Sequence, residues 1–370
     1  MIMVQLRPSW NDRNSTAARR GGIDAEIVEI NPEWSVLGVG ISMQGPALRA
    51  LKAVGVLDRI VGKGFGYSYF KACDVNGNVT ATVELPSLNG PSCPATMGIM
   101  RQALHDVLKD SVTEHDVPVQ LGVTVSSFAD EGERVDVRFN DGSERSYDLV
   151  VGADGANSKI REMLFGPEPK ADYTGQAVWR ATVPRPPEVE ARYSYFGPRN
   201  KAGFNPVSRE SMYVYLVQNL PEWTRLPDDR LAEVMREQLA DFGGHLAHAR
   251  DQISDPRDIV YRPIGSLILD PPWFLGRVLL IGDAAHTTTP HMAAGAGLAI
   301  EDSVVLAELL TSDRPMPEVL EDFMTRRYER CRMTAANSRQ LGEWEKTPNA
   351  PDADPVGLFD TSIRQLAQPI

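Results

Sequence analysis

Apolar residues along the chain fall into two kinds of pattern. Short runs rich in Val, Leu and Ile are typical of buried strands in a parallel sheet. These runs occupy residues 25–30, 149–153 and 277–282. Stripes of apolar residues at helical spacing predict helices. These stripes occupy residues 48–54, 101–108 and 300–309. The order of strands and helices predicts an α/β unit.

The segment from about 171 to 264 follows a different pattern. Alternating strands rich in aromatic residues, such as AVWRATVP and SMYVYLVQN, are separated by proline-rich turns. The amphipathic stretch at 231–242 predicts a helix packed on these strands. Asn-Gly at 76–77 and Asp-Gly at 141–142 predict hairpins. The sequence therefore predicts an antiparallel sheet beside the parallel one.

Length and composition bound the class of protein. A chain of 370 residues is long enough for two domains, and 42% apolar and 24% charged residues are typical of globular proteins. The net charge of −12 disfavours nucleic acid and anionic membranes as partners, because both attract basic surfaces. The three cysteines lack CxxC spacing, and no apolar run reaches the length of a membrane span. We expect a cytoplasmic protein without a metal site, a monomer or homodimer, that binds small molecules.

One long motif runs from Gly276 to Leu310. A strand ends near Asp283, and a helix begins at the glycines of residues 295–297. Small residues at a helix start leave backbone N–H groups free for an anion or an electron-rich ring. The alternative is that these glycines only permit close packing. His286, in the turn between strand and helix, is expected to be structural.

A second motif, DGANSKIR at 154–161, follows the strand at 149–153 and predicts a turn into a helix. GDAAH at 282–286, the residues after it and DGANSKIR together resemble two motifs of the flavoprotein aromatic hydroxylases. The resemblance covers roughly residues 17–345. It implies that the chain binds FAD.

The resemblance also implies which residues contact the cofactor. Asp283 would bind the ribityl chain of FAD, and the helix start after Pro290 would face the flavin pyrimidine. This helix start consists of Gly295, Ala296 and Gly297. Arg101 would contact the FAD phosphates, and Asp154 would lie near the pyrophosphate and the nicotinamide cofactor. Glu29 closes the second strand of a βαβ unit, where an acid accepts hydrogen bonds from the adenosine ribose.

The implied reaction uses NADH or NADPH and O2 to hydroxylate a small hydroxyaromatic or N-heteroaromatic substrate. The implied fold is α/β, a Rossmann-like FAD-binding domain with an inserted antiparallel-sheet substrate domain. We expect the FAD-binding domain to comprise residues 1–71, 93–170 and 265–346. We expect the substrate-binding domain to comprise 72–92 and 171–264, and a poorly ordered tail to follow at 347–370.

Five side chains are candidates for catalysis and substrate contact. Tyr213 and Tyr215 share one face of a strand and are placed to face the pocket, although aromatic strand residues most often belong to the core. Gln44 lies in a turn that runs beside the flavin in relatives, and the alternative is a solvated turn residue. Arg180 and Lys201 are the cations that we nominate to receive a substrate carboxylate or phenolate.

The N-terminus departs from the family pattern. MIMVQL is expected to be the first parallel strand, and Ser15 is placed to cap a short helix through Arg20. The expected GxGxxG turn is missing, and the side chains of residues 8–14, PSWNDRN, block close approach of the backbone to phosphate. Arg13 offers a partly compensating cation. We therefore expect weaker FAD binding than in an intact relative.

Two other functions stay open at this point. A non-catalytic remnant would keep the fold and bind an aromatic ligand without FAD. A related flavin reductase or dehydrogenase would not use O2, because the flavin motifs do not determine how the reduced flavin is reoxidised.

Overall fold

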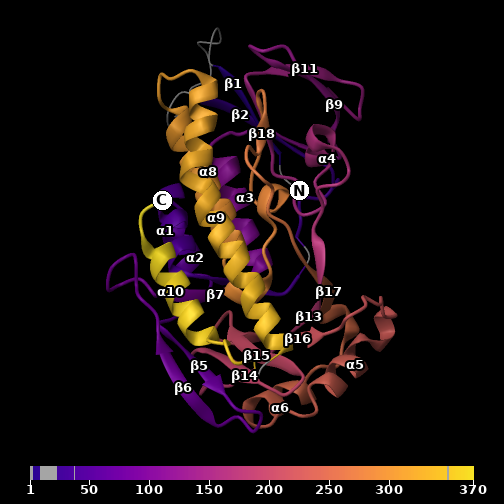
Figure 1. Ribbon diagram of the computed structural model, residues 1–370, viewed down its shortest axis with the longest axis vertical. Coiled ribbons are helices and arrows are strands. Elements are labelled where there is room, and N and C mark those ends of the chain that lie inside the picture. Colours follow the sequence, from indigo (N-terminus) through magenta and orange to yellow (C-terminus); the bar gives the residue numbers. More distant parts are fainter. Residues whose placement is uncertain (1–2, 9–22, 37, 348–349) are drawn as a thin grey trace.

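The computed structural model describes residues 3–8, 23–36, 38–347 and 350–370. Figure 1 shows two large sheets, one above the other along the longest axis of the molecule. Helix α9 (Met316–Lys346) runs beside both of them, from the upper sheet to the lower one. The fold is α/β, as the sequence predicts.

The upper sheet has six strands in the order β18-β19-β12-β1-β2-β8. They are β18 (Phe274–Leu275), β19 (Val278–Leu280), β12 (Leu149–Gly152), β1 (Met3–Pro8), β2 (Ile23–Glu29) and β8 (Val119–Leu121). β2, β8, β12 and β19 run in one direction, and β1 and β18 run against them. Because the carboxyl ends of parallel strands meet at one edge, Glu29, Asp154 and Asp283 come to the same edge of this sheet.

The predicted parallel direction of the first strand is wrong. β1 pairs antiparallel with both of its neighbours, and Pro8 lies opposite Ile23. An antiparallel pair needs only a reversal of the chain, whereas a parallel pair needs a crossover over the sheet. Pro8 at the end of β1 therefore lies at the edge of the sheet opposite to Glu29. The predicted helix from Ser15 to Arg20 and the predicted role of Arg13 lie outside the described residues.

Smaller sheets and helices complete the upper half. The sheet β11-β10-β9 comprises Glu144–Tyr147, Val135–Phe139 and Val125–Asp130, and the sheet β3-β7-β4 comprises Gly40–Met43, Thr96–Met100 and Phe65–Tyr67. The helices are α1 (Gly45–Val54), α2 (Leu57–Val61), α3 (Arg101–Glu114), α4 (Lys159–Phe165), α7 (Asp283–His286), α8 (Gly295–Leu310) and the 3-10 turn η3 (Pro290–Met292). The predicted hairpin at 141–142 is confirmed, since Phe139 N–H donates to the Ser143 carbonyl at 2.9 Å.

The lower sheet has seven strands in the order β17-β13-β16-β15-β14-β5-β6. They are β17 (Ile259–Ser266), β13 (Asp172–Pro184), β16 (Ser211–Asn219), β15 (Asn200–Pro206), β14 (Arg192–Phe196), β5 (Tyr69–Cys73) and β6 (Val79–Glu84). Its outer face packs on α5 (Leu231–Gln238) and α6 (Gly244–Asp251), and two short 3-10 turns, η1 (Asp228–Arg230) and η2 (Pro256–Asp258), lie nearby. The predicted hairpin at 76–77 joins β5 to β6.

The two halves meet closely because glycine stands where a side chain would collide. A Cβ at Gly98 of β7 would overlap the carbonyl oxygen of Pro206 at the end of β15, and one at Gly40 of β3 would overlap the ring of Tyr213. The inner face of the lower sheet therefore lies directly against the sheet β3-β7-β4.

The predicted disorder of the C-terminal tail is wrong for residues 355–367. They form helix α10 (Pro355–Ala367), and the Asp354 carboxylate accepts a hydrogen bond from Gly357 N–H at its start. At its end, guanidiniums from two other helices bind backbone carbonyls: Arg49 donates to Ala367 at 2.8 Å and Arg330 to Leu366 at 2.5 Å. Cations at the carbonyl end of a helix stabilise the helix. The prediction of disorder rested on the composition of the tail, which does not reveal Arg49 and Arg330 as partners.

Helices α8 and α9 are joined by a buried ionic network. Arg327 of α9 donates to Asp302 at 2.7 Å and to Glu301 at 3.0 Å, and all three side chains are at most 1% exposed. Arg330 adds two hydrogen bonds to Glu301, at 2.7 and 2.8 Å. Buried charges are tolerated only when they are paired in this way.

Arg327→Leu should therefore destabilise the protein by about 3–5 kcal/mol, because it leaves buried carboxylate charge without its main cation. The free energy of unfolding in urea measures the effect. Arg332→Leu on the same helix is the matched control and should change stability little, since Arg332 is half-exposed and pairs with Glu329 at the surface. Equal effects of the two substitutions would contradict this account.

Candidate functional site

Asp283 begins helix α7 just past the carboxyl end of β19. Its side chain is exposed to solvent, and desolvation by the surrounding protein raises the pKa of its carboxyl group. His286 and Arg101 act in the opposite direction on this pKa. An exposed carboxylate at a strand end suits hydrogen bonds from hydroxyl groups of a ligand.

The N-terminus of α8 has no side-chain cap among the described residues. Its first backbone N–H groups therefore remain available, and Ala293 before the helix adopts a left-handed conformation with φ 51°. Gly297 also permits close packing, because a Cβ there would lie 3.0 Å from the Cβ of Ala47 on α1. The structure thus supports the packing role of Gly297, and the contact of this helix start with a ligand stays a prediction. Gly295 and Ala296 are partly exposed at this start, and Pro290 is partly exposed in η3.

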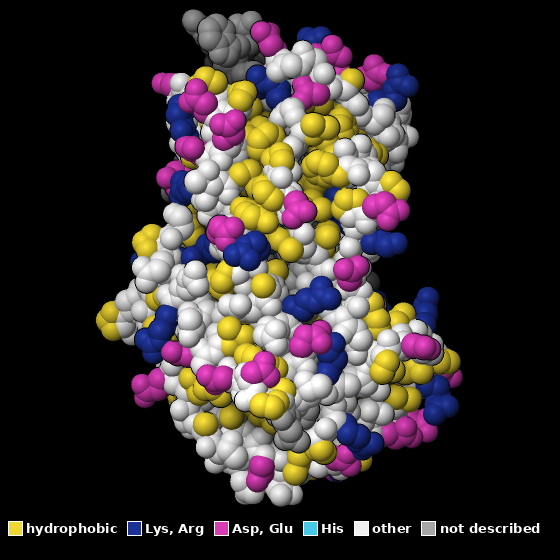
Figure 2. Space-filling view, viewed as in Figure 1, with side chains coloured by type: hydrophobic (Ala, Val, Ile, Leu, Met, Phe, Trp, Pro, Cys, Tyr) yellow, Lys and Arg dark blue, Asp and Glu magenta, His cyan; other side chains and the backbone are white. Residues whose placement is uncertain are grey.

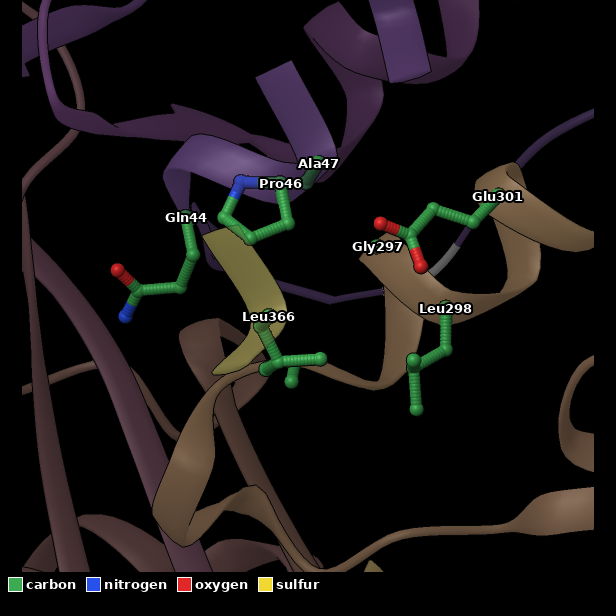
Figure 3. A pocket seen from close by; sticks show the side chains of 8 residues that line it. Gln44, Pro46, Ala47, Gly297, Leu298, Glu301 and Leu366 are labelled. Atoms are coloured by element: carbon green, nitrogen blue, oxygen red, sulfur yellow. The ribbon is translucent and has the colours of Figure 1, made fainter. Parts of the chain in front are cut away.

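Gln44 lies immediately before α1, in a small pocket between α1, α8 and α10 (Figure 3). The pocket holds only about 10 Å³, roughly one water. Pro46, Leu298 and Leu366 form further walls. Because Gln44 is only 6% exposed, the alternative of a solvated turn residue is wrong.

The motif DGANSKIR positions the carboxyl edge of the upper sheet. Asp154 is buried, and its carboxylate accepts hydrogen bonds from Ser158, from Lys159 N–H at 2.6 Å and from Ile160 N–H at 3.1 Å. Arg161 donates to the Ala284 carbonyl at 2.9 Å. The second motif thus holds the turn that carries Asp283, and Asp154 caps α4.

Glu29 and Arg101 flank the same edge. Glu29 ends β2, and its carboxylate accepts a hydrogen bond from Asn31 N–H at 2.9 Å. Arg101 begins α3, and its backbone N–H donates to the Val39 carbonyl at 3.2 Å. Its guanidinium has no hydrogen-bond or ion-pair partner within the described residues, so it remains available to an anion.

Arg180 lies on the inner face of β13, opposite to the face where Trp179 enters the core. Its guanidinium likewise has no such partner within residues 3–8, 23–36, 38–347 and 350–370. Desolvation by burial lowers the pKa of the Arg180 guanidinium, and the positive charge of Arg101 lowers it further. Tyr213 acts in the opposite direction and raises this pKa. Two neighbouring cations without a carboxylate form a locus that favours an anionic ligand.

Tyr213 and Tyr215 share the inner face of β16, as predicted, and both are less than 10% exposed. The Tyr213 hydroxyl lies 3.1 Å from Ser42 Oγ and accepts a hydrogen bond from Asn205 at 3.2 Å. The Tyr215 hydroxyl lies 2.7 Å from Ser194 Oγ. These bonds favour the core interpretation, with both phenols as walls that join the two halves.

Sequence reasoning missed three polar residues where the inner face of the lower sheet meets the sheet β3-β7-β4: Tyr67, Arg192 and Asn205. Tyr67 of β4 donates to Asn205 of β15 at 2.6 Å. Arg192 of β14 lies over the ring of Tyr215, 5.6 Å from its centroid. Desolvation opposes the charged form of Arg192, but the phenols of Tyr215, Tyr67 and Tyr213 raise its pKa overall. The alternation in RYSYFG places Arg192 and Ser194 on one face, and this was the available signal.

Lys201 is already paired, unlike Arg180. Its ammonium lies 2.6 Å from Glu345 near the end of α9, and His291 lies 3.3 Å from the second oxygen of the same carboxylate. Although burial alone would raise it, Lys201 and His291 hold the pKa of Glu345 at about 2. The nomination of Lys201 as a substrate-binding cation stays a prediction, and the internal carboxylate of Glu345 competes with a substrate anion for it.

His286, Asp302 and Cys331 offer ligand atoms within 4.8 Å of one another. His286 Nε2 lies 2.6 Å from Asp302 Oδ2, which also accepts a hydrogen bond from Gly282 N–H at 2.9 Å. Arg327 occupies the other oxygen of Asp302. This cluster joins the turn at 282–286 to Asp302 of α8, and the guanidinium of Arg327 supplies its positive charge. These contacts agree with a structural role for His286.

The distribution of charge on the surface does not indicate a particular class of binding partner. Charges of both signs are interspersed over the face seen in Figure 2. None of the helices in the described part of the chain combines the length and the apolar character that a membrane span requires.

Comparison with known proteins defines the class. The profile of a family described as FAD binding domain matches residues 16–333. The chain therefore belongs to this family, and it is an FAD-dependent oxidoreductase of the aromatic hydroxylase type.

Two relatives and one solved structure show to which members of this family the chain is similar. The chain is 31% identical to 2-heptyl-3-hydroxy-4(1H)-quinolone synthase of Pseudomonas aeruginosa, over 88% of this chain and 85% of that protein. It is 30% identical to 6-hydroxynicotinate 3-monooxygenase of Pseudomonas fluorescens, over 78% and 77%. The structure of HpxO from Klebsiella pneumoniae in complex with FAD and uric acid shares the fold, with a TM-score of 0.77 at 22% identity over 92% of this chain and 85% of that one.

The described residues fit FAD at one end better than at the other. An open carboxylate at Asp283, the uncapped start of α8 and the unpaired guanidinium of Arg101 suit the ribityl chain, the flavin ring and a phosphate. For the adenosine end, the sequence lacks the glycine turn of the family, and Pro8 at the end of β1 lies at the edge of the sheet opposite to Glu29.

The ion pair of Lys201 with Glu345 predicts a dependence of stability on pH. The folded pKa of Glu345 is lowered from 4.5 to about 2, so its contribution is complete above about pH 4.5 and is lost as the pH falls toward 2. Glu345→Gln should flatten the fall in unfolding free energy over this range. Glu343→Gln, which removes a more exposed pair with Lys346, should keep the slope of the wild type. Identical slopes for wild type and Glu345→Gln would refute the assignment.

Proposed function

We propose that the protein hydroxylates a small hydroxyaromatic or N-heteroaromatic compound with NAD(P)H and O2. The relatives support this reaction through their names, which specify a quinolone, a hydroxynicotinate and, for the HpxO structure, bound uric acid. When bound, FAD would supply the redox chemistry, with NAD(P)H as the reductant and O2 as the oxidant, so that one oxygen atom enters the product and the other leaves as water. The chain contributes binding, orientation and exclusion of water.

The observation that supports the proposal is the position of Arg180 on the inner face of the lower sheet, without a hydrogen-bond or ion-pair partner for its side chain among the described residues. We propose that the lower sheet with α5 and α6 is the substrate-binding domain. Arg180 receives a carboxylate or phenolate of the substrate, and Arg101 binds the FAD phosphates. Tyr213 and Tyr215 form walls, because their hydroxyls are already bonded. Gln44 and the start of α8 line the flavin side, with Asp283 on the ribityl chain and Glu29 toward the adenosine ribose.

The geometry also supports a division of roles between cations. Lys201 is paired with Glu345, and Arg192 lies against the Tyr215 ring, whereas the Arg180 side chain has no hydrogen-bond or ion-pair partner among the described residues. An arginine with a free planar guanidinium binds a carboxylate through two hydrogen bonds. We further propose a cytoplasmic monomer or homodimer, consistent with three free cysteines.

Arg180→Gln should raise KM for anionic aromatic substrates roughly tenfold or more, because a charge-assisted pair is lost. FAD content and KM for uncharged analogues should stay unchanged. Substrate-stimulated consumption of NAD(P)H and O2, with detection of the hydroxylated product, provides the assay. Arg199→Gln on β14–β15 is the control, since Arg199 pairs with Asp241 at the surface.

Two results would count against the proposal. An unchanged KM in Arg180→Gln would remove Arg180 from the substrate site. NAD(P)H oxidation without substrate-dependent O2 consumption would favour a flavin reductase or dehydrogenase.

A further inference from the structure

A second pocket, of about 240 Å³, lies on the outer side of the lower sheet. Tyr261 of the edge strand β17 lines it and pairs with Trp179 of β13. Arg180, the next residue of β13, points to the opposite face. The pocket and the proposed catalytic site are thus separated by the sheet, and the pocket needs its own explanation.

Aromatic rings form the floor of this pocket. The ring of Tyr261 stacks on Trp179 with centroids 3.9 Å apart, and Trp223 lies 4.6 Å from Tyr261 on the loop before α5. The Tyr261 hydroxyl donates to the Thr224 carbonyl at 3.1 Å and so holds this loop in place. A fixed aromatic floor favours a planar ring, which stacks on it without reorganisation.

Charged side chains surround the floor without pairing. Arg225 and Asp228 have no hydrogen bond or ion pair from their side chains within the described part of the chain, and the one partner of Arg262 there is the Tyr261 carbonyl at 2.9 Å. Arg230, which lies next to the pocket but outside its lining, is paired with Glu233 at 2.7 Å. The pocket therefore presents two cations and one carboxylate to a ligand.

We propose that this pocket binds a planar aromatic molecule that carries an anionic group and a hydrogen-bond donor. The ring stacks on Trp223, which Tyr261 supports from beneath, the anion lies between Arg225 and Arg262, and Asp228 accepts the donor. The volume is below that of a site for a drug-sized ligand, so one ring or a fused pair fits. Hydroxyaromatic acids and the adenosine phosphate half of NAD(P)H share this chemistry. The proposal does not depend on the reaction at Arg180.

Equilibrium dialysis with salicylate and with 5′-AMP tests the pocket and distinguishes the two sources. The full chain is used in an Arg180→Gln background, which weakens binding of the anionic probe at the other site. At least one probe should bind, and the double substitution Arg225→Gln with Arg262→Gln should weaken it at least about tenfold. Trp223→Leu should also weaken it, through loss of stacking.

Arg230→Gln is the matched control, because Arg230 stands beside the pocket but pairs with Glu233, and it should leave binding unchanged. Binding of 5′-AMP alone would assign the pocket to the nucleotide, and binding of salicylate alone would assign it to an aromatic acid. Absence of binding by both probes, or full affinity in the double variant, overturns the proposal.

Discussion

The contact of Arg327 with Glu301 and Asp302 is the interaction on which the site depends. It joins the long helix α9 to the first turns of α8 in a region without water access. Asp302 also accepts a hydrogen bond from Gly282 N–H, and its Oδ2 lies within hydrogen-bond distance of His286 Nε2. These two contacts fix the turn that carries Asp283. The position of an open carboxylate and of an uncapped helix start thus follows from one buried charge network.

A second constraint is the direction of the strands in the upper sheet. The parallel strands bring Glu29, Asp154 and Asp283 to one edge, as ligand sites of α/β sheets require. β1 runs against its neighbours, so Pro8 lies at the opposite edge, and the sequence after it lacks the glycine turn of the family. Under our proposal FAD binding relies on the carboxylate, the helix start and Arg101, and we expect it to be weaker than in a relative with the turn.

Much of this architecture could be predicted from local sequence. The strands before Asp154 and Asp283, both hairpin turns and the shared face of Tyr213 and Tyr215 follow from periodicity and turn chemistry. The pairing of Lys201 with Glu345 joins residues far apart in the chain, so no local pattern reveals it. The same holds for helix α10, whose end is bound by Arg49 and Arg330, and for the direction of β1, which depends on its neighbours in the sheet.

Titration of purified protein with FAD, for the wild type and for Asp283→Ala, tests the central claim that this edge and helix start form the flavin site. We predict that the wild type binds FAD and that Asp283→Ala loses about 1–3 kcal/mol of affinity, because a charged hydrogen bond to the ribityl chain is lost. Asp270→Ala, which removes an exposed carboxylate, should bind as the wild type does. Equal affinity of Asp283→Ala and wild type, or a wild type that binds no FAD, would contradict the account.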